Sequence, residues 1–171
     1  MDEIVDVVDK DNKVLRQVSK SEAHQKGLLH RTIIAEIIDS KGRMTLIRQA
    51  SDRQDAGQYV SPVGGHAKAG ETEEDTLKRE AFEEAGLKDF EYKRIGQVIY
   101  NRNVLSRQEN HYFILYEIHS DEPITLNEES VEYETFSEDE LKTAIKQQPK
   151  RFGGAFYVIL ESFYPHLLEK K

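Results

Sequence analysis

Residues 65–87 read GHAKAGETEEDTLKREAFEEAGL, and their order predicts a loop that leads into a helix. Thr72 and Asp75, three residues apart, form a capping pair, and the following acidic turn suits the positive end of the helix dipole. Gly86 stands where a glycine commonly ends a helix. The sequence therefore predicts a helix from about Glu73 to about Ala85.

Three glutamates gather near the end of this predicted helix. Glu80, Glu83 and Glu84 are spaced so that their carboxylates lie on one helix face. They repel one another, and the negative end of the helix dipole disfavours each of them by about 0.3–1 kcal/mol. Such a cluster suits Mg²⁺ or Mn²⁺, which takes its remaining ligands from waters and substrate phosphates. Arg79 is placed to pair with Glu80 or Glu83.

The spacing within residues 65–87 also carries a resemblance. Composition alone favours a solvated, charge-rich surface helix. The fixed positions, however, match one by one the signature G-x5-E-x7-R-E-U-x-E-E-x-G-U of the Nudix hydrolases, where U is an apolar residue. The match begins at Gly65, and only Ala81 is smaller than the usual apolar residue. The chain therefore resembles the Nudix hydrolase family.

This resemblance implies an enzyme that splits a nucleoside diphosphate linked to another moiety, by attack of a metal-activated water on phosphorus. It also implies a role for each matching residue. These roles are Glu83 and Glu84 as metal ligands, Glu80 as ligand or general base, the Gly64 carbonyl as a backbone ligand, Glu71 in the outer shell of the metal, and Arg79 as the residue that orients the glutamates. The family tends to use one more carboxylate outside the signature, and Glu109, Glu128 and Glu129 stay open as candidates.

A second resemblance covers residues 23–31, 65–66 and 109–111. These segments are similar to the isopentenyl-diphosphate isomerase branch of the Nudix superfamily. In those isomerases, histidines at positions like His24, His30 and His66, with a carboxylate like Glu109, hold a divalent metal. The resemblance therefore implies a second metal site here, with ordinary packing of the histidines as the alternative. Imidazole ligands suit Mn²⁺ or Zn²⁺.

Two departures weigh against isomerase activity. Gly64 stands where the isomerases carry a catalytic cysteine, and His111 stands where they carry a catalytic glutamate. Without the thiol, proton transfer across an allylic carbon loses a principal acid or base. Hydrolysis is therefore the predicted reaction, with isomerisation as the alternative. A nucleotide-binding module without turnover is a third reading, which the complete set of signature residues disfavours.

Composition narrows the class of protein. The 171 residues predict one domain spanning residues 1–171. The net charge of -8 argues against nucleic-acid polymers and anionic membranes as partners, so we expect a small-molecule diphosphate substrate. The chain has no cysteine, which excludes disulfides and thiol catalysis. No apolar run reaches the roughly 18 residues that span a bilayer, so we expect a cytoplasmic protein. A homodimer stays open.

Positively charged side chains near the site must then bind the substrate phosphates. Gly65 has no side chain, so its backbone can approach a ligand closely. The cations considered for phosphate binding are Lys68, Arg48, Arg53 and Arg102. Lys68 is the best placed because it lies inside the signature loop. Stacking on a base by Tyr59, Tyr100 or Tyr112 is considered too, against the commoner alternative of core packing.

The first half of the chain predicts mostly strands. A hairpin is expected over residues 3–19 and a short helix over 21–26, both within an N-terminal part of residues 1–30. A β-branched, nearly continuous apolar run predicts a buried strand over 32–38, followed by a second strand over 44–48. Residues 51–58 are expected to form a loop.

The second half predicts strands, then helices. Strands are expected over 90–100 and 111–119, separated by a polar loop, and an acidic loop is expected over 126–134. Ser137 with Glu140 predicts the capping box of a helix that reaches about Gln147. A last helix over 156–168, within a C-terminal part of residues 137–168, would pack into the core. The Nudix resemblance implies an α/β/α sandwich with a mixed β-sheet.

Overall fold

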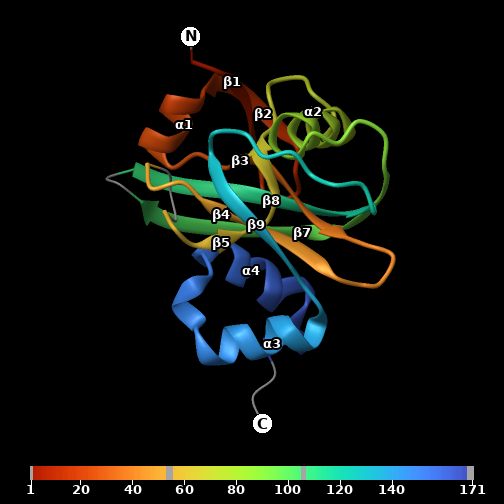
Figure 1. Cartoon of the computed structure of the whole chain (residues 1–171). Helices are drawn as coiled ribbons and strands as arrows, with labels where there is room; N and C mark the ends of the chain where they lie inside the picture. Colours follow the sequence, from red (N-terminus) through yellow and green to blue (C-terminus); the bar gives the residue numbers. More distant parts are fainter. Residues whose placement is uncertain (1, 53–55, 105–106, 169–171) are drawn as a thin grey trace.

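A mixed sheet with helices on both faces forms the centre of the computed structural model, which describes residues 2–52, 56–104 and 107–168. In Figure 1, α1 and α2 lie above the sheet, and α3 and α4 lie below it. The strands are β1 (Ile4–Val8), β2 (Val14–Ser19), β3 (His30–Ile38), β4 (Met44–Gln49), β5 (Tyr59–Val60), β6 (Val63–His66), β7 (Glu91–Val104), β8 (Arg107–His119) and β9 (Ser130–Phe136). The helices are α1 (Lys20–Lys26), α2 (Glu73–Ala85), α3 (Glu138–Gln147) and α4 (Gly154–Phe163), with 3-10 turns η1 (Pro149–Arg151) and η2 (Pro165–Leu168). The predicted α/β class and mixed sheet are confirmed.

β3 is the strand around which the sheet is built. It pairs in parallel with β8 and antiparallel with β1, β4 and β6. Its β-branched residues suit a position that is buried on both faces, as the sequence predicted. Because β3 neighbours both β6 and β8, it brings residues far apart in the sequence to one place.

The two faces of β3 contribute to two separate cores. Ile33 and its neighbours two residues along the strand pack against α2, where Leu77 and Ala81 are fully buried. Ile34, on the opposite face, packs in the core that contains Phe156 and Leu160 of α4. Side chains of a strand alternate between faces, so one continuous apolar run supplies both layers. The sheet is thereby fixed between two groups of helices.

The predicted caps of α2 are present. The Thr72 side chain accepts a hydrogen bond from the Asp75 backbone N–H, and Gly86 adopts the left-handed conformation with φ 70°. Gly86 N–H donates to the carbonyl oxygens of Ala81 and Phe82. The predicted bounds of this helix agree with the structure.

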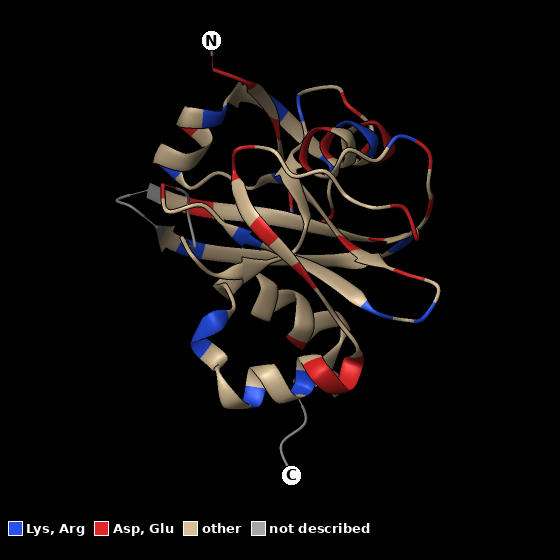
Figure 2. Ribbon diagram, viewed as in Figure 1, with Lys and Arg blue, Asp and Glu red and all other residues tan. Residues whose placement is uncertain are grey.

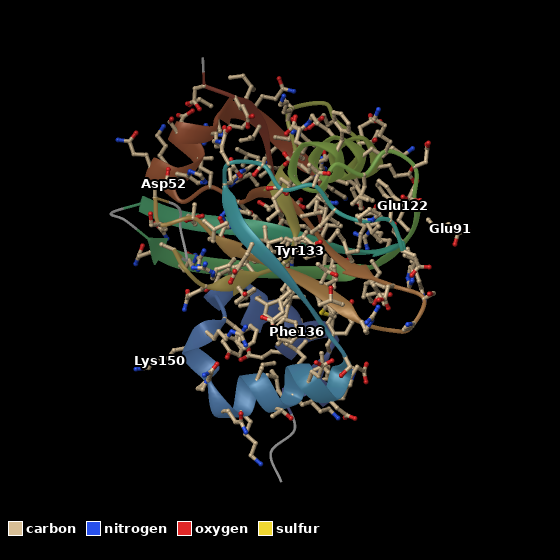
Figure 3. All side chains as sticks on the ribbon, viewed as in Figure 1. Asp52, Glu91, Glu122, Tyr133, Phe136 and Lys150 are labelled. Atoms are coloured by element: carbon tan, nitrogen blue, oxygen red, sulfur yellow. The ribbon has the colours of Figure 1, made fainter. Side chains whose placement is uncertain are left out.

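Several other predicted elements are confirmed. The N-terminal hairpin forms β1 and β2, and α1 ends at Gly27. Ser137 and Glu140 make the reciprocal capping box of α3. Phe136, labelled in Figure 3, lies at the end of β9 where the chain enters α3, and it is buried in the same core as Leu141.

The polar loop predicted over residues 101–110 is wrong. β7 extends to Val104 and β8 begins at Arg107, and within these strands Asn101 pairs with Asn110 and Arg102 pairs with Glu109. Polar composition suggested a loop. Antiparallel backbone pairing extends beyond the apolar core, however, and polar side chains there can border a cleft instead of solvent alone.

The acidic loop predicted over residues 126–134 is also partly wrong. Residues from Ser130 onward form β9, which pairs with β4. Val131 and Tyr133 alternate with glutamates along the strand, and both apolar side chains are exposed. This alternation fits a strand, but the acidic composition of the segment suggested a loop.

The last helix is shorter than predicted. α4 begins at Gly154 and ends at Phe163, and Pro165 starts the separate turn η2. Proline lacks the N–H that would continue the helical hydrogen bonds. The predicted core residues Phe156, Ile159 and Leu160 are buried. Among the described residues, none of the helices is both long and apolar enough to cross a membrane.

Candidate active site

A cleft of about 630 Å³ opens where the end of α2 meets β6 and the centre of the sheet. Its floor carries Glu80, Glu83 and Glu84 beside the glycines of β6. An apolar wall formed by Ile34, Ile47, Val60, Val63, Phe113 and Phe156 closes the other side. Figure 2 shows acidic residues on α2 and on the segments around it. The three glutamates predicted to act together therefore line one cavity.

Arg79 fixes the carboxylates on the cleft floor. Its Nε and Nη2 donate to the two carboxylate oxygens of Glu71, each at 2.9 Å. Its Nη1 donates to Glu80 at 2.6 Å and lies 3.6 Å from a carboxylate oxygen of Glu83. Its Nη2 also donates to the carbonyl oxygen of His66 at 3.1 Å. A planar guanidinium has the fork geometry for such contacts, so Arg79 ties the helix to β6.

Glu71 is held by donors from the protein itself. Besides Arg79, its carboxylate accepts hydrogen bonds from the Lys68 backbone N–H at 2.7 Å and from Thr76 Oγ1 at 3.2 Å. These contacts fit a role in positioning Arg79. They leave Glu71 less suited to direct metal binding than the glutamates at the end of the helix.

The two glycines of β6 lie directly over the glutamates. Gly64 N–H donates to Glu84 Oε2 at 2.7 Å. A Cβ atom on Gly65 would lie 2.2 Å from Glu80 Cδ, too close for any side chain. Gly65 is therefore required by the packing of Glu80 under the strand, whereas a Cβ on Gly64 would meet no atom within 4 Å.

The electrostatics of the floor favour a cation. Burial raises the pKa of Glu80 to about 7, against the opposing effect of Arg79 and with a further upward contribution from Glu83. Burial also raises the pKa of Glu84 well above its usual value, although the Gly64 N–H opposes this. Glu80, Glu129 and Glu83 add repulsion at Glu84. These carboxylates resist ionisation because their negative charges are crowded and desolvated, and a divalent ion would remove that penalty.

Four histidines from four different elements meet beside the cleft, and two of them, His66 and His111, line it. His24 comes from α1, His30 from β3, His66 from β6 and His111 from β8, and one possible ligand atom from each lies within 4.8 Å of the others. The rings of His30 and His66 are stacked, with centroids 5.0 Å apart. The sheet register explains the meeting, since Thr32 of β3 pairs with His66 and His30 pairs with His111.

The hydrogen bonds of these histidines indicate which nitrogens face inward. His30 Nδ1 lies 2.8 Å from the carbonyl oxygen of Leu28, so Nδ1 carries the proton in the neutral ring. Nε2 of His30 and Nε2 of His66 are buried and have no hydrogen-bond partner among the described residues. Desolvation lowers the pKa of His30 to about 4, which keeps the ring neutral. A buried neutral nitrogen with no partner fits a metal ligand.

In the sequence, His111 is notable only because it stands where the isomerases carry a catalytic glutamate. In the structure it belongs to the cluster, but both of its nitrogens are engaged: Nδ1 lies 2.7 Å from Thr32 Oγ1, and Nε2 lies 2.8 Å from Glu109 Oε1. Its place next to His30 depends on the parallel pairing of β3 with β8, and its own sequence neighbours give no sign of that pairing. Glu109 is buried and lines the cleft.

The predicted phosphate-binding cations separate in space. Lys68 and Arg102 line the cleft. Arg48 lies outside the lining and donates to Glu132 at 2.8 Å. Arg53 lies outside the described residues. The structure therefore keeps Lys68 as a candidate and does not bring Arg48 to the glutamates.

The structure also distinguishes among the candidate carboxylates outside the signature and among the tyrosines considered for base stacking. Glu109 and Glu129 line the cleft, whereas Glu128 is exposed and does not. None of the tyrosines considered for base stacking lines the cleft. Tyr59 and Tyr112 are buried in the two cores, and Tyr100 packs against the α4 side. The commoner alternative, core packing, holds for these tyrosines.

Comparison with known proteins agrees with this arrangement. The model of the NUDIX domain family matches residues 28–154. An isopentenyl-diphosphate delta-isomerase 2 of Photorhabdus laumondii is 33% identical over 119 residues, which is 67% of each chain. An uncharacterised Nudix hydrolase of Streptomyces coelicolor is 36% identical over 86 residues, 50% of this chain and 48% of that protein.

Solved structures support the same fold. The crystal structure of DR0079 from Deinococcus radiodurans superposes with a TM-score of 0.76 at 18% identity, covering 95% of this chain and 99% of that one. The NUDIX domain of Shewanella oneidensis NrtR, in complex with ADP ribose, superposes with a TM-score of 0.60 at 14% identity, covering 80% of this chain and 87% of that one.

Proposed function

Because the chain belongs to the Nudix family, we propose that it is a divalent-metal-dependent hydrolase that cleaves a diphosphate bond in a small molecule. The observation that carries the proposal is the convergence of Glu80, Glu83 and Glu84 on one cleft, under the backbone of β6. These carboxylates repel one another, and Glu80 and Glu84 are partly buried whereas Glu83 is exposed, so the cluster destabilises the fold, which is typical of functional sites.

Glu83, Glu84 and Glu80, with the Gly64 carbonyl, would hold Mg²⁺ or Mn²⁺. When bound, such an ion neutralises phosphate oxygens and lowers the pKa of a coordinated water. Arg79 keeps the glutamates in register through the contacts described above. Glu80 would serve either as a further ligand of the ion or as the base that accepts a proton from the attacking water.

The diphosphate would lie against β6 and the loop that follows it. Gly65 has no side chain, so the backbone can approach the phosphate oxygens. Lys68 follows in the same loop and supplies positive charge at the cleft. Glu129 or Glu109 would complete the carboxylate set from outside the α2 segment, because both line the cleft.

A second metal site is proposed at His24, His30 and His66 with Glu109. The buried Nε2 atoms of His30 and His66 support it, since they have no hydrogen-bond partner among the described residues. Nitrogen donors favour Mn²⁺ or Zn²⁺ over Mg²⁺. The two sites would therefore differ in metal preference while sharing one cleft.

An isomerase acting on an isoprenoid diphosphate is the second candidate function. The histidine cluster and the 33% identity to a protein named as such an isomerase favour it. Gly64 offers no thiol, however, and His111 is tied to Thr32 and Glu109. Hydrolysis needs neither group, so the hydrolase remains the better supported function.

One assay distinguishes these functions. The protein is incubated with Mg²⁺ or Mn²⁺ and a panel of nucleoside-diphosphate-linked compounds and isoprenoid diphosphates. Release of monophosphate or phosphate supports the hydrolase, rearrangement of the allylic double bond supports the isomerase, and binding without either supports a non-catalytic nucleotide-binding module.

The glutamates provide the mutational test of the same proposal. Glu83→Gln and Glu84→Gln should each lower kcat by about 100-fold or more, because each removes a charged metal ligand. Glu74→Gln is the matched control, since Glu74 is exposed on the same helix and does not line the cleft. Unchanged turnover in both cleft variants would contradict the proposed metal site.

A further inference from the structure

Glu36 is a buried carboxyl group that the proposed hydrolysis does not use. It lies in the middle of β3 and its side chain is fully buried. Ser61 Oγ lies 2.6 Å from Glu36 Oε2, and Oε1 has no hydrogen-bond partner among the described residues. A buried carboxylate with a single hydrogen bond destabilises a fold, so packing alone does not account for a glutamate here.

The surroundings of Glu36 add to its cost. Glu117 faces it across the parallel pairing of β3 with β8. Tyr164 covers both strands and donates to Glu117 Oε2 at 2.6 Å. Burial, opposed by the Ser61 hydrogen bond and reinforced by Glu117, raises the pKa of Glu36 to about 7. Both protonation states of Glu36 are therefore accessible near neutral pH.

Ser61 connects this buried group to the cleft. It lies between β5 and β6 and lines the cleft beside Val60, whereas Glu36 lies behind it. Ser61 stands three positions before Gly64, whose N–H contacts Glu84. Three residues of extended backbone span about 10 Å at most, so Ser61 lies within reach of a group next to the bound diphosphate.

A serine hydroxyl has one proton and two lone pairs. When Glu36 is ionised, Ser61 must donate its proton to Glu36, and only a lone pair remains for a ligand. When Glu36 is protonated, Glu36 can donate to Ser61 instead, and the Ser61 proton is then available to the cleft. The buried carboxyl group thereby sets the hydrogen-bonding role of the cleft hydroxyl.

We propose that Glu36 is a positioning residue that acts through Ser61, holding its hydroxyl so that it accepts a hydrogen bond from a hydroxyl group on the organic part of the substrate. This inference rests on the proposed function and names the class of substrate: a diphosphate whose organic group carries a hydroxyl near the phosphate. Val60 and Val63 flank Ser61 in the lining, so its hydroxyl supplies a polar contact between apolar side chains that a substrate hydroxyl could use and a methyl group could not.

Matched synthetic diphosphates test the proposal by calorimetry at saturating Mn²⁺. Each set has one chain length and ends in a hydroxyl, a methoxy or a methyl group; several chain lengths are compared. At about pH 8.5, above the Glu36 pKa, the hydroxyl probe of best length should bind about 3- to 10-fold tighter than the methoxy probe, which can only accept. At about pH 5.5 the affinity of the methoxy probe should increase, and the hydroxyl and methoxy probes should then bind with similar affinity. The shared diphosphate cancels the effect of pH on the metal site from this ratio.

Three variants make the test specific. Ser61→Ala should bind both probes alike at both pH values, and Glu36→Gln should show a ratio that does not change with pH. Glu117→Gln is the matched control: it removes the neighbouring carboxylate without touching Ser61, and it should keep the pH-dependent ratio. Thermal unfolding of each variant verifies that it folds.

The results that would contradict the proposal differ in which part of it they exclude. Equal binding of the hydroxyl and methoxy probes by the unmodified protein at the higher pH, or a preference that survives Ser61→Ala, would overturn the inference while leaving the hydrolase intact. A wild-type pH dependence in Glu36→Gln would remove Glu36 from it. If the methyl probe shows no Mn²⁺-dependent binding, the proposed function fails and this inference fails with it.

Discussion

At the scale of single residues, a few atoms fix the floor of the cleft. Arg79 spans Glu71, Glu80 and the backbone of β6, so one side chain holds the helix and the strand at a set distance. Gly65 allows the strand to lie directly on Glu80. The geometry of the proposed metal site therefore depends as much on an absent side chain as on the carboxylates.

The first prediction concerns this contact. Gly65→Ala should lower the affinity for Mn²⁺ by about tenfold or more, because the new Cβ would displace the Glu80 carboxylate. A tenfold loss corresponds to about 1.4 kcal/mol of binding free energy. Isothermal titration calorimetry at neutral pH measures the Mn²⁺ affinity. Gly64→Ala is the control for stability, since its Cβ meets no atom within 4 Å. Equal affinity in Gly65→Ala and the unmodified protein would show that Glu80 needs no such contact.

A second prediction at this scale concerns Arg79. Arg79→Lys keeps the charge but loses the fork that contacts Glu71 twice, and it should reduce kcat/KM by about 10- to 100-fold with a loss of about 1–3 kcal/mol in unfolding free energy. Kinetics and urea denaturation measure the two effects. Lys78→Arg, on the exposed side of α2, is the control. Full activity of the Arg79 variant would mean that charge alone suffices.

At the scale of elements, α2 combines a well-capped start with an electrostatically unfavourable end. Its first turn is acidic and Thr72 caps it, but its last turn contains no basic residue. The helix dipole therefore stabilises the start and disfavours the ionised Glu83 and Glu84. A bound cation at the cleft would reverse the second effect.

The pH dependence of stability follows from the end of α2. The folded pKa values of Glu80 and Glu84 are raised above their unfolded values, to about 7 for Glu80. Their contribution to stability is complete below the unfolded pKa and is lost as pH rises through the folded pKa. Without divalent metal, these two carboxyl groups should therefore lower the Tm as pH rises from about 5 to about 8, whereas His30 and His66, whose pKa values are lowered by burial, contribute in the opposite direction up to their unfolded pKa.

Both a bound divalent metal and the loss of one carboxylate should suppress the decrease in Tm that these carboxyl groups cause as pH rises. Saturating Mg²⁺ binds the ionised form and should restore the Tm at the higher pH, and Glu84→Gln should flatten the profile because it carries no charge at either pH. Differential scanning calorimetry with and without chelator measures all three curves. If the Tm difference between Glu84→Gln and the unmodified protein does not change over this pH range in the presence of chelator, the raised pKa of Glu84 is contradicted.

At the scale of the whole molecule, the histidine cluster joins parts of the chain that are far apart in sequence. α1, β3, β6 and β8 each supply one ring, so a bound metal would connect the N-terminal hairpin region to the centre of the sheet. Metal binding there should appear as global stability, since these elements separate on unfolding.

Zn²⁺ or Mn²⁺ should therefore raise the Tm in a saturable way even when Glu83→Gln and Glu84→Gln remove the carboxylate site. At a free metal concentration of 100 times the Kd, binding should raise the free energy of unfolding by about 2.7 kcal/mol. His30→Gln should abolish this gain, whereas His166→Gln, on the exposed turn η2, should keep it. A gain that survives His30→Gln would place the ion elsewhere.

The sequence anticipated much of the fold, and the misses share a cause. Caps such as Thr72 and Gly86 act within a few residues, so the sequence places helix ends well. The strand from Ser130 to Phe136 and the extension of β7 and β8 were missed because polar composition suggests a loop, whereas backbone pairing with another strand decides that these segments are extended.

The same division holds for the candidate site. Helical periodicity is a local property, so the pattern of residues 73–85 was enough to predict that Glu80, Glu83 and Glu84 share one face beside Arg79. The metal-binding role of the adjoining Gly64 was implied by the Nudix resemblance. Only the tertiary structure decided that His111 joins the histidine cluster, that Arg48 pairs with Glu132 away from the cleft, and that Glu36 lies behind Ser61. The register between β3 and its neighbours sets these contacts, and register depends on how the whole sheet packs between its helices.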